Sequence, residues 1–361
     1  MKNKIISIVL IVLFLGLSVF SWLKPATEYS ESERRKLTQF PKISVSSVFS
    51  GNFMKNFETY STEQFPLRDY FRALKAYVNN NVFNMKDNND VFVRNGHILK
   101  LEYPLNEESV SNAAKKFKYV YDKYLVENDT KVYFSVVPDK KYYVDIGDYL
   151  TIDYNKLISQ IKTETEFMHY IDISTLLDSE CYYYTDTHWR QEKLLPVARK
   201  LASEMGVELK AEYKENLLEN DFYGVYYGQY ALDFEADKIV YLTNDILENV
   251  RVYDYENQKQ ISVYDMEKAF GRDPYEMFLS GSLPLISIEN ENATTEKELV
   301  IFRDSFGSSL APFFAEGYKE ITVVDIRYIH PNTLEKYMEF TNQDVLFIYS
   351  TSLLNKSETI K

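Results

Sequence analysis

The chain has 361 residues, of which 45% are hydrophobic and 16% aromatic, and this is enough apolar material to bury the core of one large or two smaller domains. A single cysteine, Cys181, excludes an intramolecular disulfide, and the four histidines are scattered, so we expect neither a metal site nor a cofactor. The formal net charge of −13 disfavours nucleic acid and anionic lipid surfaces as partners.

The first 24 residues predict a membrane anchor. The uncharged run from Ile5 to Leu23 would span about 28 Å as a helix, close to the hydrocarbon thickness of a bilayer. A cleaved signal peptide is the competing interpretation, with a weak small-residue site at Val19-Phe20-Ser21. Lysines flank the run on both sides, but its short N-terminal tail is typical of a signal-anchor. We therefore expect a single-pass protein in which residues 1–24 form the cytoplasmic tail and anchor and the remaining chain is extracellular.

The polar, turn-rich residues 25–52 are predicted to form a tether, which leaves residues 53–361 for the extracellular domain. Apolar residues recur at helical spacing between Phe53 and Val82, with an interruption at Phe65-Pro66. This pattern predicts two helices, which we expect to act as a lid or strut on the core.

Four short, nearly continuous apolar runs predict strands buried on both faces, at residues 131–138, 298–302, 320–326 and 344–349. Helix-like segments lie at residues 107–125, 308–318 and 333–342. The alternation of strands and helices towards the C-terminus predicts an α/β fold in which a parallel sheet is flanked by helices on both sides.

Ser305 lies in the turn between a predicted strand and helix, within Arg303-Asp304-Ser305-Phe306-Gly307. Ligand sites in parallel sheets gather at the carboxyl ends of strands, and a hydroxyl there is exposed. Backbone N–H groups at the helix start could stabilise an oxyanion, and Gly307 would allow close approach. The alternative is that Asp304, Ser305 or Ser308 only caps the helix.

A serine nucleophile needs a base, and a histidine base needs an acid that fixes its tautomer. Asp186 and His188 provide such a pair within the aromatic run Y-Y-Y-T-D-T-H-W-R that begins at Tyr182. Two residues apart in an extended loop, both side chains would point to the same side. Ser305, His188 and Asp186 are therefore the predicted nucleophile, base and orienting acid.

The motifs D-T-H-W, from Asp186 to Trp189, and R-D-S-F-G, from Arg303 to Gly307, resemble those of the SGNH-hydrolase-like domain of alginate O-acetyltransferases of the AlgX and AlgJ type and of the related bacterial DHHW family. Weaker likenesses lie in four other stretches, at residues 32–41, 63–69, 137–140 and 273–281. The resemblance covers nearly the whole chain beyond the anchor.

This resemblance implies an SGNH-hydrolase-like fold and a Ser-His-Asp catalyst that transfers or removes O-acetyl groups on an extracellular polysaccharide. Thr187 stands where the DHHW pattern has its first histidine, so that position is not expected to be the base. Ser280-Gly281-Ser282 stands where the resemblance implies a glycine pair followed by an amide side chain. This stretch therefore lacks the Asn-type side chain that would donate to the oxyanion.

Further candidates for substrate or oxyanion binding are Gly307, Arg303, Asp139 and Lys140. A turn salt bridge or cap is the alternative role for Arg303, and solvated loop charges are the alternative for Asp139 and Lys140. The aromatic run from Phe222 to Tyr230 could stack on sugar rings, but in a chain with 31 tyrosines ordinary packing is the better explanation for it.

The sequence thus predicts a membrane-anchored O-acetyltransferase or acetylesterase acting on a cell-surface polysaccharide, with a membrane-bound O-acyltransferase as a candidate acetyl donor. One rival hypothesis is a catalytically inactive polysaccharide-binding or scaffold subunit. A second is a thioesterase or acyl-carrier partner in teichoic acid modification.

Overall fold

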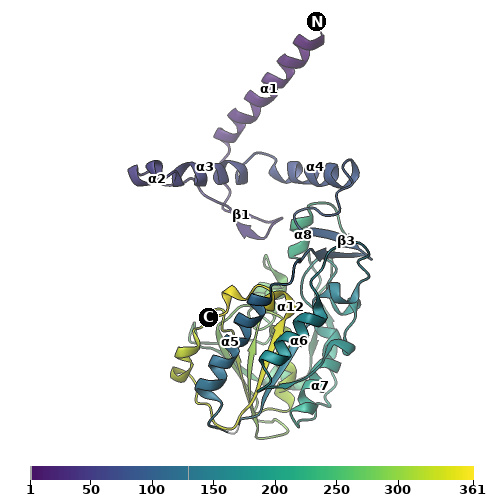
Figure 1. The fold of residues 1–361 in the computed structure, drawn as a ribbon, viewed down its shortest axis with the longest axis vertical. Helices are drawn as coiled ribbons and strands as arrows, with labels where there is room; N and C mark the ends of the chain where they lie inside the picture. Colours follow the sequence, from purple (N-terminus) through teal and green to yellow (C-terminus); the bar gives the residue numbers. More distant parts are fainter. Residues whose placement is uncertain (1, 129) are drawn as a thin grey trace. The chain divides into compact units, whose positions relative to one another are not determined.

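The computed structural model describes residues 2–128 and 130–361, and the described chain forms two compact units (Figure 1). The first contains the chain up to Asn89 together with Tyr227–Phe234, and the second contains Asp90–Tyr226 and Glu235–Lys361. Residues 53–89 thus belong to the same compact unit as the N-terminal segments, whereas the sequence predicts a domain that starts at residue 53.

The first unit consists mainly of helices. Its elements are α1 (Lys2–Leu23), β1 (Tyr29–Ser30), β2 (Arg35–Lys36), α2 (Val45–Phe49), α3 (Asn52–Glu63) and α4 (Arg68–Asn81). The two helices expected between Phe53 and Val82 are confirmed as α3 and α4, with the break at Pro66. Residues Asn3–Leu23 of α1 are long and apolar enough to cross a membrane, as an anchor or as a signal sequence.

The second unit is built around an eight-stranded sheet. In spatial order its strands are β10 (Lys259–Ile261), β9 (Arg251–Asp254), β11 (Leu285–Glu289), β13 (Glu320–Val324), β12 (Glu298–Arg303), β14 (Asp344–Ser350), β5 (Val132–Val137) and β6 (His169–Tyr170). The five strands from β13 to β6 pair in parallel, whereas β11, β9 and β10 pair antiparallel. The four predicted strands β5, β12, β13 and β14 are confirmed, and the three antiparallel strands extend the predicted sheet.

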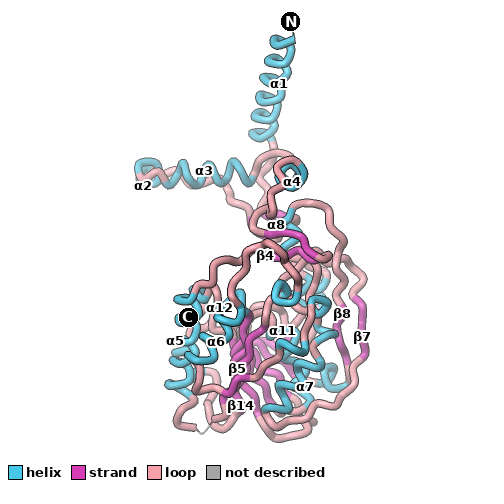
Figure 2. The backbone as a smooth tube through the Cα atoms, turned by 45° about the vertical axis from the view of Figure 1, so that its right-hand side comes forward, coloured by secondary structure: helices cyan, strands magenta, loops and turns pink. Residues whose placement is uncertain are grey.

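Helices cover both faces of this sheet (Figure 2). The α-helices of the unit are α5 (Glu107–Tyr124), α6 (Tyr154–Glu164), α7 (Leu195–Glu204), α9 (Asp245–Asn249), α10 (Met266–Ala269), α11 (Gly307–Leu310) and α12 (Thr351–Leu354), while α8 (Val225–Tyr230) runs from this unit into the first. Two hairpins complete it: β3 (Val91–Arg94) with β4 (His97–Lys100), and β7 (Lys214–Leu217) with β8 (Val240–Thr243). The short 3₁₀ helices are η1 (Lys140–Tyr143), η2 (Ser174–Leu176), η3 (Ser179–Cys181), η4 (Gln191–Lys193), η5 (Pro274–Met277), η6 (Ala311–Glu316), η7 (Pro331–Lys336) and η8 (Ser357–Thr359).

Alternate residues of each central strand face opposite layers of the core. In β12, Leu299 and Ile301 pack in one hydrophobic cluster with α7, and Val300 and Phe302 pack in another with α5 and α6. Side chains of successive strand residues point to opposite faces, so a strand buried on both sides reads as a continuous apolar run. This explains why β12 is visible in the sequence.

The order of the strands places a topological switch at β12. The chain passes from β12 to β13 on one side, and from β13 it returns to β14 on the other side of β12. In open α/β sheets, ligands bind beyond the carboxyl ends of the strands at such a point. Residues that directly follow Arg303 therefore occupy the position where this fold usually places its chemistry.

Candidate active site

Ser305 lies in the turn directly after β12, and His188 and Asp186 come from the loop at Tyr182–Trp189. Ser305 Oγ is 2.8 Å from His188 Nε2, and His188 Nδ1 is 2.6 Å from Asp186 Oδ1. The second carboxylate oxygen accepts a hydrogen bond of 2.8 Å from the backbone N–H of Val225. The three predicted residues therefore form one continuous hydrogen-bonded chain, although Ser305 follows His188 by 117 positions in the sequence.

Of these three side chains, the acid is buried, and the base and the nucleophile are partly exposed. Asp186 is 2% exposed, the His188 side chain is 15% exposed, and Ser305 is partly exposed. When Nδ1–H donates a hydrogen bond to Asp186, the Nε2 of the neutral imidazole carries no proton. It can then accept a hydrogen bond from the serine hydroxyl. This arrangement can deprotonate Ser305 when the hydroxyl attacks a carbonyl carbon.

The loop that carries Asp186 and His188 is a tight turn rather than an extended segment. Tyr182 and Trp189 face each other as an antiparallel bridge, and the N–H of Tyr183 donates to the carbonyl of His188. Asp186 Oδ1 also accepts from the backbone N–H of His188, at 3.0 Å. The acid thus fixes both the backbone and the ring of the base.

A second carboxylate, Asp237, holds the start of this turn. It accepts hydrogen bonds from the backbone N–H groups of Tyr184 and Thr185, at 2.8 and 2.7 Å, and from the Thr185 hydroxyl. Burial raises the pKa of Asp237, while these hydrogen bonds act in the opposite direction. No feature of the sequence near Asp237 indicates this role, because the partners are about fifty residues away.

Tyr275 supports the base from one side. Its ring stacks on the His188 imidazole with centroids 3.9 Å apart and planes 11° from parallel, and its hydroxyl lies 2.9 Å from Ser309 Oγ. Trp189 joins the two halves of the site, because its Nε1 lies 3.0 Å from both the carbonyl of Phe306 and Ser309 Oγ. The tryptophan of the D-T-H-W motif therefore ties the turn of the base to the turn of the nucleophile.

In the turn after β12, Asp304 rather than Ser305 accepts backbone hydrogen bonds, and among the described residues α11 has no side-chain cap. Asp304 accepts from the backbone N–H of Phe306 at 3.1 Å and from that of Ser350 at 2.8 Å. The N–H of Gly307 donates to the carbonyl of Asp304, so this N–H group already has a partner. A side chain on Gly307 would place its Cβ 2.6 Å from that of Arg303, and close packing explains the glycine.

The other candidate residues have internal partners. Arg303 is fully buried and donates to Asp325 Oδ2 at 3.1 Å and to the carbonyl of Gly281 at 3.2 Å. Asp139 is 8% exposed and accepts from the Tyr154 hydroxyl at 2.6 Å and from the N–H of Lys141. These contacts favour a structural role for both side chains.

Lys140 is buried beneath the turn that carries Asp186 and donates hydrogen bonds to its backbone. Its Nζ donates to the carbonyls of Tyr183 and Tyr184, at 2.8 and 2.9 Å, and the side chain is buried. Burial lowers the pKa of this amine to about 7, against the opposite influence of Asp237 and Asp186. Lys140 therefore positions the loop and has no direct contact with Ser305 among the described hydrogen bonds.

No protein-family model and no curated protein matches the sequence. Among solved structures, the fold is similar to a DHHW family protein from Eubacterium siraeum DSM 15702, with 24% identity and a TM-score of 0.62 over 75% of this chain and 95% of that chain. It is also similar to Bacillus cereus PatB1 with a sulfonyl adduct, with 19% identity and a TM-score of 0.59 over 73% and 95% of the two chains.

The O-acetyltransferase domain of Pseudomonas putida AlgJ matches at 11% identity over 73% of this chain and 92% of that chain, but with a TM-score of 0.44 this likeness supports no argument. The SGNH-hydrolase-like α/β fold expected from the motifs is confirmed, and so is the resemblance to the DHHW group at the level of the fold.

Proposed function

We propose that the chain is a membrane-anchored extracellular O-acetyltransferase or acetylesterase that acts on a cell-surface polysaccharide. The observation that carries the proposal is the hydrogen-bonded chain from Ser305 through His188 to Asp186 at the switch point of the sheet. The apolar α1 helix supports the attachment to a membrane. Ser305 is the proposed nucleophile, His188 the base and Asp186 the orienting acid.

In the proposed reaction, Ser305 Oγ attacks the carbonyl carbon of an acetyl ester while its proton passes to His188 Nε2. The ester bond to the leaving alcohol then breaks, and that alcohol takes the proton from His188. In the second half, a sugar hydroxyl or water attacks the carbonyl carbon of the acetyl-serine and gives its proton to His188. The bond to Ser305 Oγ then breaks, His188 returns a proton to this oxygen, and the acetylated sugar or acetate leaves. Asp186 stabilises the imidazolium in both halves.

Transfer and hydrolysis differ only in the second acceptor, so both use the same three residues. A membrane-bound O-acyltransferase is the proposed acetyl donor for transfer. PatB1, which shares the fold, was solved with a sulfonyl adduct, and a sulfonyl fluoride is therefore a suitable probe for this chain.

The test uses the full chain in detergent, with a sulfonyl fluoride as the covalent probe and a small aryl acetate as substrate. We expect the probe to modify Ser305, and Ser305→Ala and His188→Ala to lose about three to six orders of magnitude in turnover. Asp186→Asn should retain a small fraction of the wild-type turnover, because the acid only orients the base. The double variant Ser305→Ala/His188→Ala should be little worse than either single one.

Circular dichroism is the control for folding, because Ser→Ala in a partly exposed turn is expected to change stability by about 1 kcal/mol or less. If folded Ser305→Ala reacted with the probe and the ester like the wild type, the triad would be wrong. The rival role, a polysaccharide-binding or scaffold subunit without catalysis, would then be the better explanation.

A further inference from the structure

Helix α4 of the first unit has an apolar face that is exposed. Five large side chains, each between 44% and 76% exposed, recur along it at helical spacing: Leu67, Tyr70, Phe71, Leu74 and Tyr77. Positions three and four residues apart lie on the same side of a helix, so these side chains form one stripe. We call this stripe the α4 apolar face.

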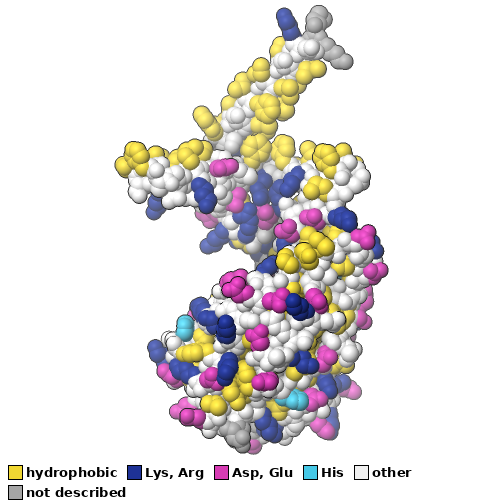
Figure 3. Space-filling view, in the orientation of Figure 1, with side chains coloured by type: hydrophobic (Ala, Val, Ile, Leu, Met, Phe, Trp, Pro, Cys, Tyr) yellow, Lys and Arg dark blue, Asp and Glu magenta, His cyan; other side chains and the backbone are white. Residues whose placement is uncertain are grey.

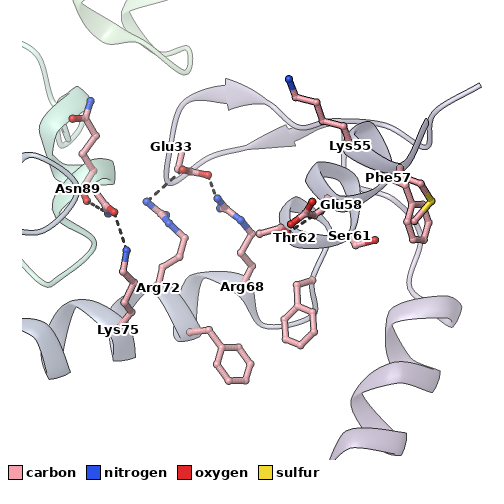
Figure 4. A pocket seen from close by; sticks show the side chains of 14 residues that line it. Glu33, Lys55, Phe57, Glu58, Ser61, Thr62, Arg68, Arg72, Lys75 and Asn89 are labelled. Carbon is pink, nitrogen blue, oxygen red and sulfur yellow. Dashed lines mark hydrogen bonds and ion pairs between the residues drawn. The ribbon is translucent and has the colours of Figure 1, made fainter. Parts of the chain in front are cut away.

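The opposite side of α4 is covered by the segment around β1 and β2. Glu33 lies 2.5 Å from Arg68 and 3.5 Å from Arg72, and both contacts are visible in Figure 4. Arg72 also donates to the carbonyl of Gly228, and Ala76, one turn further on, is fully buried. The rotation of α4 about its own axis is thereby fixed, and the apolar face points away from these contacts.

Neighbouring helices extend this apolar surface. Val45, Phe49 and Met54 are 76%, 88% and 61% exposed, on α2 and α3. Figure 3 shows hydrophobic side chains gathered along one side of α2, α3 and α4, with lysines, arginines and acids along the other side. A hollow of about 1090 Å³ adjoins it, lined in part by Phe57, Phe65, Phe71 and Lys75. Apolar surface of this extent marks an interaction site.

The connection to α1 identifies the partner. α1 ends at Leu23, and four residues later the backbone N–H and carbonyl of Thr27 are both hydrogen-bonded to the Gln64 side chain, each at 2.8 Å. Gln64 caps the C-terminus of α3, immediately before α4. Four extended residues reach at most about 14 Å, so a membrane-spanning α1 keeps the α3–α4 junction in or next to the headgroup layer.

The charge of this unit also suits a membrane surface. Residues 24–89 with 227–234 carry ten basic and eight acidic side chains, a net of +2, while residues 90–226 with 235–361 carry 29 basic and 46 acidic side chains, a net of −17. The acidic excess that disfavours an anionic surface for the whole chain therefore belongs to the second unit. Exposed Tyr side chains on α4 and Trp22 at the end of α1 are of the two types enriched at membrane interfaces.

We propose that the α4 apolar face, continued by α2 and the start of α3, lies in the interfacial layer of the membrane that α1 crosses. This inference rests on the anchoring part of the proposed function and adds a second contact to it. A helix with one apolar and one charged face lies in the plane of the interface. One transmembrane helix alone would let the remaining chain swing about its tether, whereas this second contact would restrict that motion.

The test is site-directed spin labelling of the full chain in vesicles of phosphatidylcholine and phosphatidylglycerol. One variant is Leu74→Cys, and its matched control is Asp69→Cys, on the same helix but about 140° away around its axis. Both positions are exposed, at 56% and 62%. Cys181 is buried, and the chain without an added cysteine measures its background labelling.

We expect the nitroxide at position 74 to collide with oxygen several-fold more often than with a water-soluble nickel chelate, and the nitroxide at position 69 to show the reverse. Equal nickel accessibility at both positions would overturn the proposal, because the face would then be in water. Protection of position 74 from both reagents would also overturn it and would indicate a protein partner or a second copy.

Vesicle flotation separates this result from the anchor itself. If the chain floats with the vesicles while position 74 stays in water, the anchoring by α1 is supported and the proposed contact of the α4 apolar face is overturned. A full chain that does not float overturns the anchoring and this inference together.

Discussion

Gly224 has no side chain because Asp186 occupies the space where one would lie. A Cβ on Gly224 would come within 2.3 Å of the Asp186 Cβ and 2.4 Å of its Cα, far closer than atoms can approach. We expect Gly224→Ala to displace the acid from His188 and to lower turnover of an aryl acetate by about two to four orders of magnitude, like the loss of an orienting acid.

The matched control for this change is Gly16→Ala, since nothing lies within 4 Å of the position where that Cβ would be. It should leave turnover unchanged. Wild-type activity in a folded Gly224→Ala chain would show that catalysis does not need Asp186 in its observed place.

A second residue, His97, is expected to limit stability in acid. It is 1% exposed, neither ring nitrogen makes a hydrogen bond to a described residue, and its ring lies against that of Tyr184. Burial, together with the nearby charge of Lys140 and against the opposite influence of Glu180, lowers its pKa to about 4.

Because the unfolded imidazole binds a proton near its ordinary pKa of 6.5, the contribution of neutral His97 is complete above that pH and is lost as the pH falls towards 4. The loss is at most about 3 kcal/mol. His97→Phe keeps the ring contact and removes the titration, so its urea midpoint should fall less between pH 7 and pH 4.5 than that of the wild type. His169→Phe, at a histidine whose side chain is 61% exposed, is the control, and equal acid sensitivity in all three chains would contradict the assignment.

At the scale of elements, the site depends on Trp189 joining two turns that are far apart in sequence. Trp189→Phe removes both hydrogen bonds of its Nε1, to Phe306 and Ser309, but keeps most of the apolar ring. Each buried hydrogen bond contributes about 0.5–1.5 kcal/mol, so we expect a loss of about 1–3 kcal/mol of unfolding free energy together with slower turnover.

Tyr183→Phe is the control for this change. The Tyr183 hydroxyl is buried and makes no hydrogen bond to any described residue, so its removal should be nearly neutral in a urea titration. The interpretation fails if the two variants are equally stable and equally active.

Some elements could be predicted from the sequence and others could not. Strands such as β12 and β14 are buried on both faces and read as apolar runs, whereas β9 and β10 carry exposed and partly exposed positions and give no such signal. The sequence predicts one helix over residues 308–318, but the chain forms only a short α11 and then η6, with Pro312 in its first turn. Proline removes a backbone donor, which limits the preceding α-helix.

The same distinction applies to the candidate site. Asp186, His188 and Ser305 are predictable because their residue types follow from the chemistry and two of them lie in one motif. Tyr275, Asp237 and Gly224 support them from distant segments, and their contacts exist only after folding. Their roles are steric or positional, and without the structure nothing distinguishes them from other aromatic, acidic or glycine residues.

At the scale of the whole molecule, the proposed attachment to a membrane depends on α1. α1 is uncharged from Ile5 to Leu23, and a span of this kind is held by burial of apolar surface, which salt does not weaken. An electrostatic attachment would instead be screened, since the Debye length falls from about 10 Å at 0.1 M salt to about 3 Å at 1 M.

We therefore expect the full chain, expressed in a bacterium with an intact envelope, to stay in the membrane fraction after a 1 M salt wash and to be cleaved by protease added outside the cytoplasmic membrane. The acidic second unit should be the part that protease reaches, because the short tail with Lys2 and Lys4 is the segment expected in the cytoplasm. The measurement is an immunoblot with one tag at each terminus. A soluble product that has lost only the N-terminal tag would identify α1 as a cleaved signal sequence. If the protease reaches the outer face of a closed cytoplasmic membrane and the C-terminal tag is still protected, the orientation is the reverse of the expected one.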